Sequence, residues 1–221
     1  DRRVRKDAFE NLYQTYKQFL NTSASLYCGN VKQQVFHAKA RKYVSSLECA
    51  VDANNVSSSV YHNLIDTVNR NLDKMHQYVS LRKKCLGVGE LHMYDIYTPM
   101  IADVAKKISF EEAKETVLKA LAPLGEDYVN KVKEGFENRW IDVYENQGKR
   151  SGAYSAGAYG CHPYVLLNYN GTLDDMFTLA HEMGHAMHSN YSNEAQPYIY
   201  AGYKIFVAEV ASTCNEILLM E

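Results

Sequence analysis

The sequence predicts a mainly α-helical protein with one small β element. Apolar residues recur at helical spacing along most of the 221 residues. The only clear strand signal is the short apolar run Tyr164–Leu167, which follows a stretch rich in glycine and tyrosine. Directly after it, Thr172 and Asp175 form a helix N-cap pattern that opens an amphipathic segment, residues 172–188. We therefore expect a helical core with the β element beside this helix.

Breaks in the apolar pattern divide the chain into seven expected helices. Gly29 and Gly87 are natural helix ends, and Ser109 with Glu112 forms a capping box. The aromatic stretch 91–100 contains a proline and is typical of an extended crossing. The expected helices cover residues 2–27, 31–50, 60–85, 109–121, 127–144, 172–188 and 203–221.

Composition excludes several classes of partner. The chain is 46% hydrophobic and 23% charged, with a net charge of −2, so neither nucleic acid nor an anionic membrane is expected to bind it. No apolar run approaches the ~20 residues of a membrane span. Five scattered cysteines without C-x-x-C spacing favour free thiols and a cytoplasmic location. The start, residues 1–6, is charged and lacks an initiator methionine, which predicts that the chain begins inside a longer protein.

Within residues 172–188, the letters H-E-M-G-H place His181, Glu182 and His185 in the pattern H-E-x-x-H. Residues four apart share one face of a helix, so both imidazoles can reach one metal ion. Glu182 is then placed to act as general base on a bound water rather than as a ligand. Zinc (Zn2+) is the expected metal, although cobalt or manganese can occupy such a site.

A catalytic zinc usually has three protein ligands, so a third is required downstream of the two histidines. His188 lies too far round the helix, and Glu194 would need a tight reversal of the chain. Glu216 would point to the same side as Glu209 but well beyond the metal. Glu209 follows a loop long enough to return, and small neighbours would let its helix approach closely. We therefore predict Glu209 as the third ligand.

The substrate side of the site is less determined. The strand at residues 164–167 is predicted to pair with an extended peptide. Lys149 and Arg150 are candidates to meet a substrate carboxylate, or are simply solvated. Either a cleft-lining or a packing role is compatible with the four candidate substrate-binding residues, which are Tyr154, Tyr159, His162 and Tyr164.

Beyond these motifs, the sequence resembles oligoendopeptidase F, within the thimet-oligopeptidase-like zinc peptidases. The resemblance rests on residues 94–99, 148–155, 162–169, 181–188 and 206–216. It implies a zincin-like helical peptidase core with a channel for oligopeptides. It also implies zinc at His181, His185 and Glu209, with Glu182 as base. The implied function is a zinc-dependent endopeptidase that hydrolyses peptide bonds in oligopeptides, with zinc-activated water as nucleophile.

Members of that family are much longer than this chain. Residues 1–98 are therefore expected to be a helical part, and residues 99–221 the zinc-binding catalytic half, of one larger, truncated domain. The residues that stabilise the oxyanion are expected beyond Glu221, so the isolated chain should be weakly active or inactive. The alternative is a non-catalytic helical scaffold or peptide-binding module with a vestigial metal site. The sequence does not predict an oligomeric state.

Overall fold

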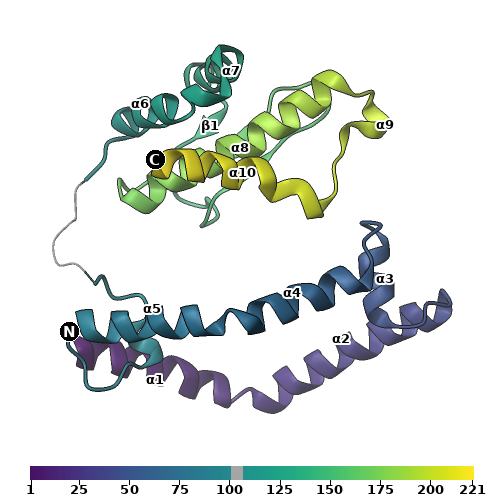
Figure 1. Cartoon of the computed structure of the whole chain (residues 1–221), viewed down its shortest axis with the longest axis vertical. Coiled ribbons are helices and arrows are strands. Elements are labelled where there is room, and N and C mark those ends of the chain that lie inside the picture. Colours follow the sequence, from purple (N-terminus) through teal and green to yellow (C-terminus); the bar gives the residue numbers. More distant parts are fainter. Residues whose placement is uncertain (101–106) are drawn as a thin grey trace. The chain divides into compact units, whose positions relative to one another are not determined.

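The first half of the chain is a long helical hairpin. The computed structural model describes residues 1–100 and 107–221, and the chain divides into two units, Asp1–Val104 and Ala105–Glu221. In the first unit, α1 and α2 form one arm, α4 and α5 form the returning arm, and α3 lies at the turn (Figure 1). Its elements are α1 (Arg2–Lys17), α2 (Leu20–Ala40), α3 (Ser46–Asp52), α4 (Ser58–Arg70), α5 (Leu72–Cys85) and the short 3-10 helix η1 (Met93–Asp95).

Several boundaries in this unit differ from those expected. The predicted helix 2–27 is interrupted at Gln18 and Phe19, and the predicted helix 31–50 is interrupted between Ala40 and Ser46. Helix α2 continues through Gly29, the predicted break, because a single glycine inside an exposed helix costs only about 1 kcal/mol. The predicted helix 60–85 is interrupted at Asn71, which separates α4 from α5. The predicted extended crossing 91–100 contains η1, since the Asp95 carboxylate accepts a hydrogen bond from the His92 backbone and closes a turn.

Asp95 is a fully buried charge that links two segments of the first unit. Its side chain is inaccessible to solvent and pairs with Arg2 at 3.0 Å and with Arg5 at 3.1 Å. The guanidinium of Arg2, the His92 backbone N–H and the guanidinium of Arg5 hold the pKa of this carboxyl well below its usual range, against the opposing effect of burial. Ionised Asp95 thus ties the start of α1 to the segment that follows α5.

Replacing Asp95 with Asn is expected to lower the thermal midpoint of the first unit by several degrees at neutral pH. Because the folded-state pKa is depressed, the contribution of Asp95 is complete above the unfolded-state pKa of about 3.9 and is lost as pH falls below it. The wild-type chain should therefore lose helical circular dichroism on acidification over a range in which Asp95→Asn changes less. Asp7→Asn is the matched control, because Asp7 makes only an exposed pair with Arg3 at 3.9 Å. Equal midpoints for the two variants would contradict this role.

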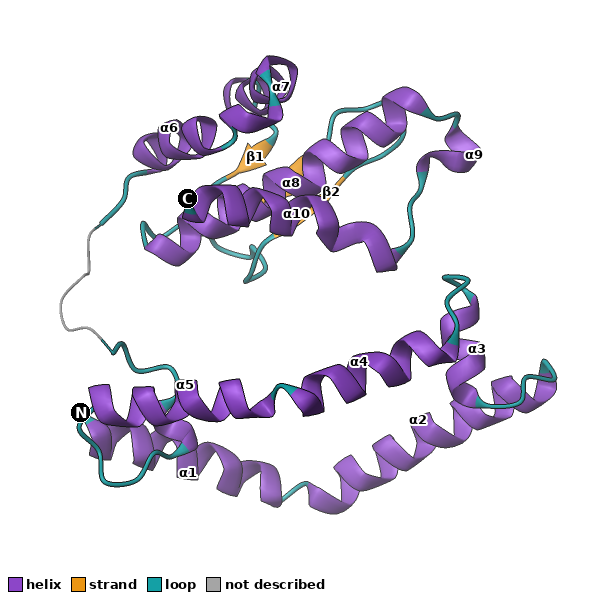
Figure 2. Cartoon of the chain, in the orientation of Figure 1, coloured by secondary structure: helices purple, strands orange, loops and turns teal. Residues whose placement is uncertain are grey.

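The second unit packs helices against a small sheet. Figure 2 shows the strands lying among the helices of this unit. The core is formed by α6, α7, the sheet and the buried face of α8, with members such as Val117, Val132, Val165, Leu179 and Met183. The elements are α6 (Phe110–Ala120), η2 (Ala122–Leu124), α7 (Glu126–Glu137), β1 (Ile141–Asp142), β2 (Tyr154–Ala156), β3 (Tyr164–Leu166), α8 (Leu173–Ala195), α9 (Tyr198–Ala201) and α10 (Ile205–Met220).

The sheet corrects two predictions. Its order is β1–β3–β2, with β1 parallel and β2 antiparallel to β3. The predicted strand is therefore central, and both of its edges are occupied, so it cannot pair with a substrate. The predicted helix 127–144 ends at Glu137, because Arg139 adopts a positive φ of 63° and the chain then enters β1.

The fold class is confirmed: the chain is mainly α-helical with a small sheet beside α8. The predicted capping box is also present, since Thr172 and Asp175 bond reciprocally at the start of α8. Among the described helices, none combines the length and apolar composition that a bilayer span requires. The assignment of both halves to one larger domain stays a prediction.

Candidate metal centre

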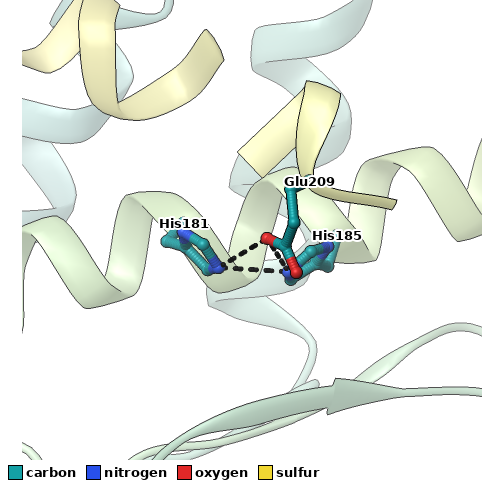
Figure 3. Close-up of side chains that lie close together, drawn as sticks. All are labelled: His181, His185 and Glu209. Atoms are coloured by element: carbon teal, nitrogen blue, oxygen red, sulfur yellow. Dashed lines mark hydrogen bonds and ion pairs between the residues drawn. The ribbon is translucent and has the colours of Figure 1, made fainter. Parts of the chain in front are cut away.

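Helix α8 brings His181 and His185 together on one face. One turn of helix separates them, and their ring centroids lie 4.7 Å apart. The two Nε2 atoms are 3.1 Å apart and point to the same place (Figure 3). The sequence produces this arrangement locally, because the capping box fixes where α8 begins and the apolar residues fix which face is buried.

Glu209 completes the group from α10. Its Oε2 atom lies 3.3 Å from Nε2 of His181 and 3.2 Å from Nε2 of His185, and Figure 3 shows its side chain reaching from α10 to both rings. The three ligand atoms thus form a nearly equilateral triangle. Atoms bound at about 2.1 Å to a tetrahedral zinc lie roughly 3.4 Å from one another. The donor set and its spacing therefore fit zinc.

Glu216 lies on the same side of α10 as Glu209, as expected, but closer to the group than expected. Its Oε1 atom lies 2.5 Å from Nδ1 of His181, which donates to it. Each nitrogen of the His181 ring therefore faces a carboxylate of α10. Carboxylates in this position fix the tautomer and orientation of a ligating histidine. The spacing predicted the shared face, because residues seven apart, Glu209 and Glu216, lie two turns apart on one helix, but it could not predict the contact with the His181 ring.

Gly184 permits α10 to come this close. A Cβ atom at this position would lie 2.6 Å from Cα of Ser212 and 2.8 Å from the carbonyl oxygen of Ala211. Both neighbours are backbone atoms, so no side-chain rotation can relieve the overlap. The glycine between the two histidines therefore sets the separation of α8 and α10.

Glu182 lies on the side of α8 that faces β2. Its side chain is buried, and Oε2 has no hydrogen-bond partner among the described residues. Burial raises the pKa of the Glu182 carboxyl, and the nearby Glu209 charge acts in the same direction. The two histidines and a hydrogen bond from the Ser155 backbone lower it. A carboxylate with a free oxygen and a raised pKa is suited to take up a proton.

His188 does not join the metal group. Its ring stacks on Tyr203 with centroids 3.8 Å apart and planes inclined by 11°. Burial lowers the pKa of this imidazole, which favours the neutral form. The contact with Tyr203 holds the segment before α10 against α8.

The described contacts of the four predicted substrate-binding residues do not include His181, His185 or Glu209. Val165 faces the core, so its neighbour Tyr164 and, by the antiparallel register, Tyr154 project from the opposite face of the sheet. The ring of His162 stacks on Trp140 at 5.1 Å. The hydroxyl of Tyr159 donates to the Gln196 carbonyl at 3.0 Å.

The Lys149 amine is engaged in contacts within the chain and is not free to bind a substrate. Its side chain is only 3% exposed, and Nζ lies 3.2 Å from the Asp142 carboxylate. The same amine donates to the backbone carbonyls of Asp142 and Tyr144. It therefore ties the loop between β1 and β2 to β1, and only Arg150 keeps the predicted alternative of meeting a substrate carboxylate.

Comparison with known proteins gives matches over the whole chain. The family model described as peptidase family M3 matches residues 1–221. Oligopeptidase PepF of Bacillus subtilis (strain 168) is 52% identical over 221 residues, which are 100% of this chain and 33% of that protein. The chromosomal oligoendopeptidase F of Lactococcus lactis subsp. cremoris is 48% identical over 100% of this chain and 36% of its own length.

A solved structure agrees with these matches. The crystal structure of oligoendopeptidase-F from Enterococcus faecium superposes with a TM-score of 0.65 and 37% identity, over 99% of this chain and 31% of that one. The chain thus spans about a third of the length of the relatives that it matches.

Proposed function

Because the chain belongs to peptidase family M3, we propose that it carries the metal-binding part of a zinc-dependent endopeptidase that hydrolyses peptide bonds in oligopeptides. The sequence resemblance to oligoendopeptidase F is confirmed by relatives of that name. The relatives are about three times as long as this chain, so activity on oligopeptides is proposed for a protein of their full length.

The observation that carries the proposal is the triangle formed by His181, His185 and Glu209. Its sides of 3.1 to 3.3 Å match the spacing of zinc ligands, and Glu216 supports the orientation of one histidine. Two histidines and one glutamate around an open position are the donor set of a catalytic zinc site. A zinc ion held there would lower the pKa of a water molecule and polarise the peptide carbonyl.

Glu182 supplies the proton transfer in this proposal. Its free Oε2 accepts a proton from the attacking water and then passes it to the nitrogen of the departing amine. The raised pKa helps the first transfer, because a more basic carboxylate takes up the proton of the water more completely, and the departing amine is still basic enough to receive it.

The exposed edge of the sheet is the proposed substrate platform. β2 pairs with β3 on one side only, and its residue Ser155 lies against Glu182. An extended peptide added to the other side of β2 would lie beside Glu182 and the metal group. Main-chain pairing of this kind is indifferent to most substrate side chains. β2 thus replaces the central strand as the proposed site of strand addition.

Zinc content and zinc-dependent cleavage test the proposal. The purified chain should bind one zinc ion, measured by elemental analysis, and should slowly cleave a fluorescence-quenched oligopeptide at micromolar enzyme. Chelation should abolish the cleavage, and added zinc should restore it. A chain without zinc, or cleavage insensitive to the chelator, would contradict the proposal. Bound zinc with no cleavage by a protein of the relatives' full length would favour the peptide-binding alternative. The cytoplasmic location stays a prediction.

A further inference from the structure

A buried amide connects the two helices that carry the metal group. Asn215 lies on α10 and is only 1% exposed. Its Nδ2 donates to the Ala180 carbonyl of α8 at 2.9 Å, and its Oδ1 accepts from the hydroxyl of Tyr128, on α7, at 3.0 Å. Ala180 directly precedes His181, and Glu216 directly follows Asn215. The amide thus links the two helices next to the contact between His181 and Glu216.

The hydrogen bonds of Asn215 fix its orientation. Only the Nδ2 end can donate to the Ala180 carbonyl, so the Oδ1 end must face Tyr128. Burial raises the pKa of the Tyr128 hydroxyl to about 12, so the hydroxyl keeps its proton and remains a donor. Both polar ends of the amide are therefore satisfied, and turning it over would place Oδ1 against the Ala180 carbonyl and break that bond.

Hydrogen bonds can determine the register of two packed helices, which apolar contacts alone do not specify. The close contact of Gly184 with the backbone of Ser212 sets how near α8 and α10 lie, whereas a hydrogen bond depends on direction as well as distance. A shift of one residue along a helix moves its side chains by about 1.5 Å. Such a shift would destroy a ligand triangle with sides of 3.1 to 3.3 Å. A buried polar contact that breaks when the helices slide can select one register.

We propose that Asn215 and Tyr128 are positioning residues that set the register of α10 against α8, and through it the distance from Glu209 to His181 and His185. The inference rests on the proposed zinc site. Neither residue touches the metal or the substrate, so both act only through the placement of α10. We call the two hydrogen bonds from Tyr128 to Asn215 and from Asn215 to the Ala180 carbonyl the relay. Loss of the relay should weaken metal binding while the second unit remains folded.

Tyr128→Phe is the sharpest test because Tyr191 provides a matched control. The two rings stack with centroids 6.2 Å apart, but the Tyr191 hydroxyl donates to Asp127 rather than to α10. Tyr128→Phe should weaken zinc binding about tenfold in chelator competition, within the 10–100-fold expected for outer partners of metal ligands. It should also alter the visible absorption of the cobalt-loaded chain. Tyr191→Phe should change neither, although both variants lose one hydroxyl.

Asn215→Leu extends the test, since leucine keeps the volume and removes both bonds. It should weaken zinc binding at least as much as Tyr128→Phe, and the double variant should be no worse than Asn215→Leu alone, because both act through one relay. Fluorescence of the single tryptophan, Trp140, reports whether the second unit is folded. Equal zinc affinity in the wild type, Tyr128→Phe and Asn215→Leu would overturn the inference alone. A wild-type chain that binds no zinc would overturn the proposed function and this inference together.

Discussion

Glu182→Gln is expected to lower peptide cleavage by a factor of about 10²–10⁴ while zinc binding stays at the wild-type level. Glutamine keeps the size of the side chain but cannot accept the proton of the attacking water. Glu182 is not one of the three proposed ligand residues, so the metal group should remain intact. The measurement is the cleavage rate of a quenched peptide by a protein of the relatives' full length, with zinc content determined on the same sample.

Glu194→Gln is the matched control for this prediction. Glu194 lies on the same helix, where its Oε1 accepts from Lys131 and Asn190, each at 2.9 Å, away from the metal group. Losing this exposed pair should change the rate little. If Glu182→Gln and Glu194→Gln cleaved equally well, Glu182 would not be the general base and the enzymatic proposal would fail.

Gly184→Ala is expected to abolish tight zinc binding. The added methyl would lie 2.6 Å from Cα of Ser212 and 2.8 Å from its backbone nitrogen, so α10 must move away from α8 by an ångström or so to reach ordinary contact. Overpacking of this kind typically costs 1–3 kcal/mol, which the second unit can survive. Glu209 would leave its position beside the two histidines. Chelator competition should show at least a hundredfold loss of affinity, on the scale set by the misplacement of one of three ligands.

Gly29→Ala is the control, because no atom lies within 4 Å of a Cβ at that exposed position of α2. It should leave zinc affinity unchanged and should stabilise α2 slightly, since alanine is the better helix former. Trp140 fluorescence separates a displaced α10 from an unfolded second unit. Wild-type zinc affinity in Gly184→Ala would show that the helix spacing does not control the metal group.

The local parts of the candidate site could be predicted from the sequence. The spacing of His181 and His185 and the capping box at Thr172 are properties of one helix, so the backbone period alone places both rings on one face. The spacing argument also selected Glu209, and its carboxylate does lie beside both rings. Its role as a zinc ligand stays a prediction. The predicted helix end at Gly29 was wrong, because a single glycine does not show whether the residues around it keep the helix intact.

The sequence by itself determined the helical class, the start of α8 and the face that carries the two imidazoles. Only the tertiary structure decided that β3 is central and β2 is the edge, that Glu216 meets His181, and that Gly184 and Asn215 hold α10 against α8. The reason is physical. Helix periodicity and capping depend on residues a few positions apart, whereas strand order and helix register depend on packing between segments about 30 residues apart, which no local pattern encodes.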